Sequence, residues 1–298
     1  MNTKNKIALL LVCVISLFNQ TFAQNIDSLM AAESNTKKKD DYVYATFKGT
    51  KLINGHTVEI PKKHVLQFMI QHRFGVVSNG LYDMFGLDNA VIRLGLDYGV
   101  SEHFAFGIGR SSTQKAVDGY LKFKLLRQRE SGMPVTMTLL VASAINTLRY
   151  SDTLQENTFI HRLCYSSQLL IARKFSNALS LQLMPTWVHL NLVPGATDHN
   201  DIFSMGIGGR IKLTKRFSLS AEYYYLIPNQ ISSIYVNALS FGFDIETGGH
   251  VFQIHFTNAP GMIENQFVTM TTDQWQKMGV RVGFNISRAF ALGKKKHE

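Results

Sequence analysis

The feature that most constrains the fold is an alternation of apolar and polar side chains that recurs along most of the chain. In KHVLQFMIQHRFG, for example, apolar residues alternate with Gln67, Gln71 and Arg73. Successive side chains of a β-strand point to opposite faces, so this spacing predicts a strand with one apolar and one polar face. Twelve such strands are expected, at residues 65–74, 90–98, 104–111, 116–126, 135–148, 159–175, 179–192, 201–213, 217–225, 237–245, 250–257 and 277–292.

The lengths of the connections favour a transmembrane barrel. Short connections such as 99–103 and 176–178 alternate with long ones such as 75–89 and 258–276, although 112–115 and 127–134 depart from the rule. Outer-membrane barrels have short periplasmic turns and long extracellular loops in this order. Alternation alone leaves a two-sheet sandwich equally possible, because its inner face is apolar too.

Three features decide between these folds. Aromatic residues such as Tyr98, Trp187 and Tyr225 fall near strand ends, where membrane interfaces lie. The polar faces are rich in Gly, Ser, Thr and Gln, as in a crowded lumen. The last strand contains alternating apolar residues that lead to an aromatic, followed by residues 285–298. This motif resembles the signal read by the barrel assembly machinery, here Gly279, Val282 and Phe284. We therefore expect an all-β, antiparallel transmembrane barrel of residues 64–292, with about 12 strands (10 to 14), surrounded by outer-membrane lipid.

The residues before the barrel suggest export. Residues 1–23 have a basic start, a short apolar run and a small residue before Gln24, which predicts a signal peptide cleaved after Ala23. Residues 24–63 are expected to form a flexible leader with a hairpin at Asn54-Gly55, a turn pair that favours positive φ. This hairpin is either a periplasmic strap or a plug in the barrel. Residues 293–298 are expected to be a basic periplasmic tail.

Composition excludes several classes of protein. Beyond residue 23 only Cys164 remains, so no internal disulfide is expected. The charge of this part is +8, from 29 Lys and Arg against 21 Asp and Glu, since two of the 31 bases lie in the signal segment. Export and the lack of a dense basic stretch argue against a nucleic-acid partner. The sequence has no phosphate-binding glycine loop, and no metal-ligand spacing among His161, His189, His199, His250 and His255, so no cofactor is expected.

Four stretches carry a resemblance to a known family: HRFG, GLDNAVIRLGLDYGV, FGIGRSS and DGYLKFKLLRQ. Taken together they resemble a family of predicted outer-membrane β-barrel proteins of Gram-negative bacteria whose function is uncharacterised. The likeness is strongest over residues 42–150 and extends further by pattern. It implies a barrel in the outer membrane, but no activity, substrate or catalytic residue.

The polar faces define the candidate functional residues. If the apolar faces meet lipid, the lumen is lined by the bases Arg73, Arg93, Lys122, Lys124, Arg162, Arg210, Lys212 and Arg281 and by the acids Asp97, Asp118, Glu222 and Asp244. Eight bases against four acids predict a preference for anionic solutes. The alternative is that these charges pair with one another and only stiffen the wall.

The most direct functional prediction is a narrow channel or binding protein for a small solute, with the preference for anions that the lumen charges predict. The first alternative is a non-conducting adaptor barrel for periplasmic partners, and another is a soluble periplasmic lipid binder. A lipid hydrolase would need a serine with a histidine base. Ser111, Ser112 and His72 match no such signature, so we expect that the protein is not an enzyme.

Overall fold

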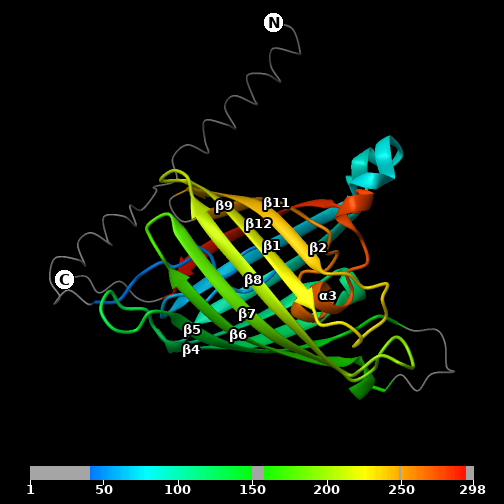
Figure 1. Cartoon of the computed structure of the whole chain (residues 1–298), viewed down its shortest axis with the longest axis horizontal. Helices are drawn as coiled ribbons and strands as arrows, with labels where there is room; N and C mark the ends of the chain where they lie inside the picture. The colour runs from blue at the N-terminus through cyan, green and yellow to red at the C-terminus, as the bar shows by residue number, and fades with distance from the viewer. Residues whose placement is uncertain (1–40, 150–157, 248–249, 293–298) are drawn as a thin grey trace, which may run out of the picture. The chain divides into compact units, whose positions relative to one another are not determined.

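The structure is a computed structural model that describes residues 41–149, 158–247 and 250–292. The predicted signal peptide, residues 24–40 of the leader and the basic tail lie outside the described residues. Within them, the chain forms twelve strands (Figure 1): β1 Val65–Val76, β2 Ala90–Gly99, β3 Phe104–Ser111, β4 Val117–Leu126, β5 Thr136–Ile145, β6 Leu163–Lys174, β7 Leu179–Leu190, β8 Asp201–Lys212, β9 Phe217–Leu226, β10 Ala238–Thr247, β11 His250–Thr257 and β12 Arg281–Ala291.

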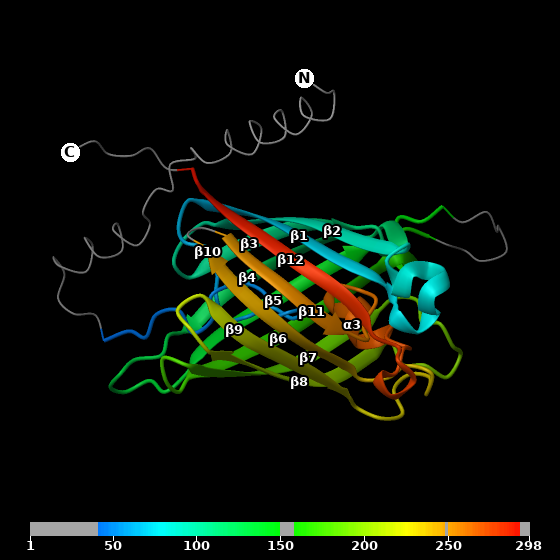
Figure 2. The ribbon, with the colours of Figure 1, turned by 90° about the horizontal axis from the view of Figure 1, so that it is seen from above.

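The sheet is a closed antiparallel barrel. Each strand pairs with its neighbours in the sequence, and β12 pairs with β1 from Ala291 opposite Val65 to Arg281 opposite Val76. Figure 2 shows β12 lying beside β1 at this closure. Closure leaves no free sheet edge, so the backbone amides of the wall are paired, as a hydrocarbon environment requires. The predicted twelve-stranded barrel is confirmed.

Alternation places the apolar half of each strand on the outside. Along β2, Leu94 and Leu96 are exposed whereas Arg93 and Asp97 are buried. In β10, Phe241 and Phe243 are exposed whereas Ser240 and Asp244 are buried. A ring of exposed Leu, Ile and Phe side chains is the surface that a barrel presents to lipid. No helix among the described residues is long and apolar enough to span a membrane.

Two strands begin four residues later than predicted. The strand expected at 159–175 begins only at Leu163, because residues Ile160–Arg162 form the 3-10 turn η4. The strand expected at 277–292 begins at Arg281, after the turn η5 (Trp275–Lys277) and a left-handed Met278 with φ 55°. Gly279 therefore precedes β12, whereas Val282 and Phe284 lie within it.

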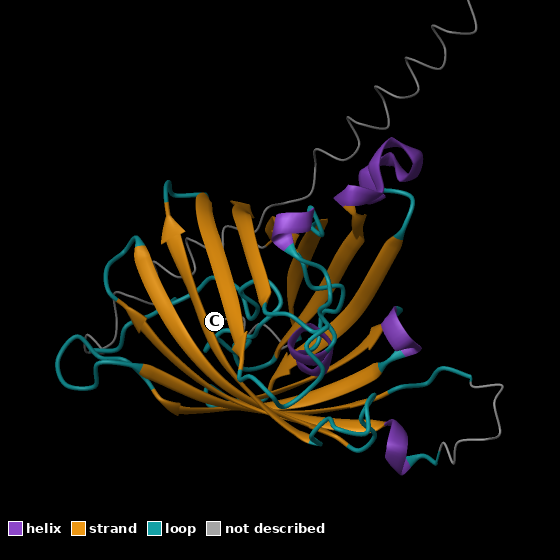
Figure 3. Cartoon of the chain, turned by 45° about the vertical axis from the view of Figure 1, so that its right-hand side comes forward, coloured by secondary structure: helices purple, strands orange, loops and turns teal. Residues whose placement is uncertain are grey.

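The barrel has two rims, which differ in the connections between their strands. The rim here called the turn rim carries the short connections, such as residues 100–103 and 175–178, as well as the start of β1 and the end of β12. The loop rim carries η2 (Val77–Gly86), η3 (Thr113–Lys115), η4 and the long β11–β12 connection with α3 (Glu264–Thr269) and η5. Loops also run through the interior of the ring of strands (Figure 3).

Leu96→Arg tests whether the outer face touches lipid. Leu96 lies opposite Phe68 and Ile108 in the neighbouring strands, within the apolar surface. We expect the free energy of unfolding, from guanidinium titrations in lipid vesicles, to fall by about 2–4 kcal/mol. Leu81→Arg, in the exposed η2 loop, is the matched control and should change little. Equal effects of the two changes would contradict a lipid-facing wall.

Candidate functional site: the filled lumen

The lumen contains a hairpin from the segment before β1, here called the N-terminal insert (residues 50–58). All nine residues are buried. The Leu52 amide donates to the Gly55 carbonyl (2.8 Å) and the Thr57 amide to the Thr50 carbonyl (3.0 Å). The turn is at Asn54-Gly55, but neither residue has the positive φ that this pair favours. The structure thus has this hairpin inside the barrel rather than as a strap outside it.

Glu222 on β9 holds the tip of the hairpin. Its carboxylate accepts the amide hydrogens of Ile53 (3.2 Å), Asn54 (2.7 Å) and Gly55 (3.1 Å). Three successive amides around one anion form a nest, a geometry that bends the chain tightly around the acceptor. Because the amides converge on a charged group, the contact accounts for the unusual turn conformation and fixes the tip in the lumen.

Arg73 on β1 holds the side chain of the tip. One of its nitrogens donates to Asn54 Oδ1 at 2.6 Å, and another donates to Asn285 Oδ1 at 3.3 Å. Asn54 Nδ2 in turn donates to Ser240 Oγ at 2.9 Å. Arg73 is fully buried, and among the described residues it has no carboxylate within ion-pair distance. Asn54 therefore stands between the guanidinium of Arg73 and the carboxylate of Glu222.

A second segment fills the lumen from the loop rim. This loop insert (residues 258–271) carries α3, all six residues of which are buried. The two inserts meet at Glu264, whose Oε1 lies 3.7 Å from Lys51 Nζ and 3.6 Å from His56 Nε2. Burial lowers the pKa of His56 well below its usual value, and the charges of Lys51 and Lys122 act in the same direction. His56 is therefore neutral in the filled lumen.

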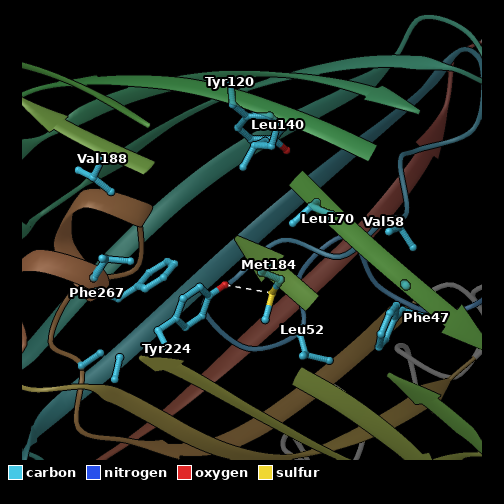
Figure 4. Close-up of a cluster of buried hydrophobic side chains, with 14 of the residues drawn as sticks. Phe47, Leu52, Val58, Tyr120, Leu140, Leu170, Met184, Val188, Tyr224 and Phe267 are labelled. Atoms are coloured by element: carbon cyan, nitrogen blue, oxygen red, sulfur yellow. Dashed lines mark hydrogen bonds between the residues drawn. The ribbon is translucent and has the colours of Figure 1, made fainter. Parts of the chain in front are cut away.

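Apolar side chains pack around the two inserts. Phe267 of α3 lies against Tyr224, with ring centroids 4.8 Å apart, and the Tyr224 hydroxyl lies 3.2 Å from Met184 Sδ (Figure 4). Leu52 and Val58 of the N-terminal insert belong to the same cluster. The interior of the barrel thus combines a small apolar core with many hydrogen bonds from the wall.

The charged residues predicted to line the lumen fall into three groups by position. Those buried on the inner face are Arg73, Arg93, Asp97, Asp118, Lys122, Glu222 and Asp244. Those half-buried toward the ends of their strands are Lys124, Arg210, Lys212 and Arg281. Arg162 lies apart from both, in η4 at the loop rim, where it donates to the Leu148 carbonyl (2.9 Å). The prediction that Arg162 belongs to a strand is wrong, because that strand starts one residue later.

Many of these charges pair with each other or with residues of the leader. Arg93 forms a two-pronged ion pair with Asp118, and it reaches across β3 because Gly109 has no side chain there. Arg210 binds Glu246 and lies 3.6 Å from Asp244. The other pairs are Lys124 with Glu59 (3.5 Å) and Arg281 with Asp273 (2.7 Å). Lys122 instead donates to the carbonyls of Thr57 (2.8 Å) and Glu59 (2.6 Å).

Sequence analysis missed the residues that hold the inserts, namely Gln182, Gln253, Asn285 and Glu264. The first three share the inward parity of their strands, so their position was predictable, but their partners lie far away in the sequence. Glu264 lies in a connection without periodicity, and no local signal indicated its burial.

The structure separates the residues considered for hydrolysis. His72 points outward and stacks on Phe284, with ring centroids 4.8 Å apart. Ser111 is buried and accepts a hydrogen bond from the Thr113 amide, while Ser112 accepts one from the Ile92 amide. Among the described residues, no group of His, Cys, Asp and Glu side chains is arranged to hold a metal ion.

Comparisons with known proteins identify a family. The family model described as "Membrane bound beta barrel domain (DUF5777)" matches residues 47–290, most of the chain. No curated protein matches at a significant level. Similar solved structures include the NanC porin (8% identity, 76% of this chain and 100% of that chain, TM-score 0.45) and the KdgM porin (6%, 77% and 99%, 0.45). An outer membrane channel from Pseudomonas putida F1 is also similar (11%, 78% and 97%, 0.43).

Glu222→Gln tests whether the amide nest holds the hairpin. The change keeps the shape but removes the charge that three amides share, which lowers the stability of the contact by about 2 kcal/mol. Amide hydrogen exchange at residues 53–55 should become about thirty-fold faster. Glu102→Gln, an exposed carboxylate at the turn rim, is the control and should leave this exchange unchanged. Unchanged protection in Glu222→Gln would contradict the nest as the anchor.

Proposed function

The chain belongs to the family of membrane bound beta barrel domains (DUF5777), and from this premise we propose that it is an outer-membrane channel for small solutes, closed by its own N-terminal insert. The observation that carries the proposal is the position of residues 50–58, which fill the lumen and are held mainly by hydrogen bonds from wall side chains. Water can replace such bonds at small net cost, about 1 kcal/mol each. The insert is therefore suited to leave and return.

The route of the insert follows from the connectivity. Residues 59–64 join the insert to β1 at the turn rim. The proposal places this rim in the periplasm, so the insert withdraws to the periplasmic side while the barrel wall stays closed. Export by a signal peptide cleaved after Ala23, and assembly through Gly279, Val282 and Phe284, belong to the same proposal.

The charges that the insert covers suggest the solute. Arg93, Arg210, Lys124 and Arg281 have carboxylate partners, whereas Arg73 and Lys122 bind neutral oxygens of the insert. Withdrawal of the insert would leave these two cations and the carboxylate of Glu222 facing the lumen, so positive charge would be in excess among these three groups. Positive groups in a narrow pore raise the local concentration of anions, so the open channel is expected to prefer anionic solutes.

One observation favours a second function. Leu52 and Val58 pack with Leu170, Met184 and other apolar side chains, as they would in a permanent core. A barrel filled in this way would be non-conducting and would serve as an adaptor for periplasmic partners. In neither case does the site present a nucleophile and base, so we propose that the protein is not an enzyme.

Glu264→Gln separates the two functions. The change removes the charge that Lys51 and His56 face, which weakens the closed state by about 1.4 kcal/mol or more and raises the open probability in planar bilayers about tenfold. Glu102→Gln should behave as the wild-type chain. Reversal potentials should show anion preference, reduced in Lys122→Gln. A folded Glu264→Gln barrel that never conducts would favour the adaptor.

The closed state is expected to weaken in acid. The pKa of His56 is lowered by burial in the lumen and returns to about 6.5 when the insert is released, so the released form takes up a proton first. The closed state thus has its full stability above pH 6.5 and loses up to about 2 kcal/mol by pH 5. Open probability in planar bilayers should rise as the pH falls from 7 to 5. His56→Gln should lack this rise, and an identical rise in that variant would exclude His56 as its cause.

A further inference from the structure

The wall of the lumen contacts the main chain of the N-terminal insert at almost every residue. Gln253 Nε2 donates to the Leu52 carbonyl (2.5 Å), and Asn285 Nδ2 donates to the Ile53 carbonyl (2.9 Å). The amides of Ile53, Asn54 and Gly55 bind Glu222. At the tip, therefore, side chains from β9, β11 and β12 bind carbonyls and amides rather than the side chains of the insert.

The same pattern continues along the second arm of the hairpin. Gln182 on β7 uses both ends of one amide: its Nε2 donates to the His56 carbonyl (2.8 Å) and its Oε1 accepts the Val58 amide (2.9 Å). Thr138 on β5 donates to the Val58 carbonyl at 3.0 Å. Lys122 on β4 binds the carbonyls of Thr57 and Glu59. A side-chain amide in this position imitates a neighbouring β-strand, which offers one donor and one acceptor to the chain beside it.

These contacts define what the lumen binds. Main-chain contacts are independent of sequence. Wall side chains form hydrogen bonds with only two polar side chains of residues 50–58: Asn54, bound by Arg73 and Ser240, and Thr50, bound by Asp97 and Gln67. The alternation of donors and acceptors fits the amides and carbonyls of a peptide. The hydroxyl groups of a saccharide can also donate to Glu222, but they do not have the spacing of three successive main-chain amides.

We propose that the lumen is a peptide-binding site, that the N-terminal insert occupies it as a resident peptide, and that short peptides are the solute class of the channel. This inference rests on the proposed function only in its last part, because binding does not require conduction. Arg73 and Lys122 add a preference for peptides that carry a carboxylate, since both cations lose the neutral oxygens of the insert when it leaves.

The test uses the full chain with Glu264→Gln, which loosens the insert but leaves the wall groups intact. The probe is a synthetic peptide of residues 50–59, TKLINGHTVE, with a fluorescent label for anisotropy and without it for current block. One control is the same peptide with methyl groups on the amide nitrogens of Ile53, Asn54 and Gly55, which removes the three hydrogen bonds to Glu222. Another control is a linear oligosaccharide of similar mass. Gel mobility before and after heating verifies that each barrel is folded, and the wild-type chain at pH 5 is a second open preparation.

The expected result is saturable binding and current block by the peptide. Its half-saturating concentration should be at least tenfold lower than that of the N-methylated peptide or the oligosaccharide. Gln182→Ala in the same chain should weaken peptide binding by about tenfold, because it removes two main-chain contacts of the wall.

The outcomes separate this inference from the channel proposal. If the chain conducts but the three probes block it equally, the peptide site is wrong and the channel stands. If the peptide binds with the expected preference in a barrel that never conducts, the peptide site stands and the channel is wrong. If no probe binds and no current flows in folded barrels of both preparations, both proposals fail.

Discussion

The structure depends on one constraint: polar groups that a closed ring of strands turns inward need hydrogen-bond partners there. Alternation sends half of the side chains of every strand into the lumen, and many of them are Gln, Asn, Glu and Arg. A buried polar group without a partner costs about 1–3 kcal/mol. The N-terminal insert supplies the partners for Glu222, Gln182, Gln253 and Asn285, so filling of the lumen follows from the composition of its wall.

The two inserts enter the lumen from opposite rims and supply different groups. The hairpin enters from the turn rim and brings amides and carbonyls, whereas α3 enters from the loop rim and brings Phe267 and Glu264. Glu264 of the loop insert contacts Lys51 and His56 of the N-terminal insert. A change in the loop insert, which is attached at the loop rim, therefore affects the hairpin, which is attached at the turn rim. Because Lys51 and Glu264 form a buried ion pair, loss of either charge leaves the other unpaired and destabilises both inserts.

Sequence was sufficient for the wall and insufficient for the interior. The strands and their facing were predictable because parity is a local property: in β10, every second residue has to meet the same environment. The pairing of Arg93 with Asp118 could not be predicted from the sequence, because Arg93 reaches across β3 and depends on the space left by Gly109. The Asn54-Gly55 hairpin was predicted correctly, but the positive φ predicted for its two turn residues was wrong. Glu222, which is 168 residues away from Asn54 in the sequence, binds the turn amides and determines the turn conformation. The burial of α3 left no periodic signal because all of its faces are covered.

Thiol labelling tests most directly whether the hairpin fills the barrel. The test uses a chain whose Cys13 and Cys164 are replaced by serine. Thr57→Cys places a thiol within the N-terminal insert, and Lys48→Cys places one just before the insert, where the side chain is half exposed. In lipid vesicles, a small charged thiol reagent should react with Lys48→Cys at least a hundred-fold faster than with Thr57→Cys, and unfolding should abolish the difference. Equal rates in the folded protein would show that the lumen is not filled by this segment and would contradict the account.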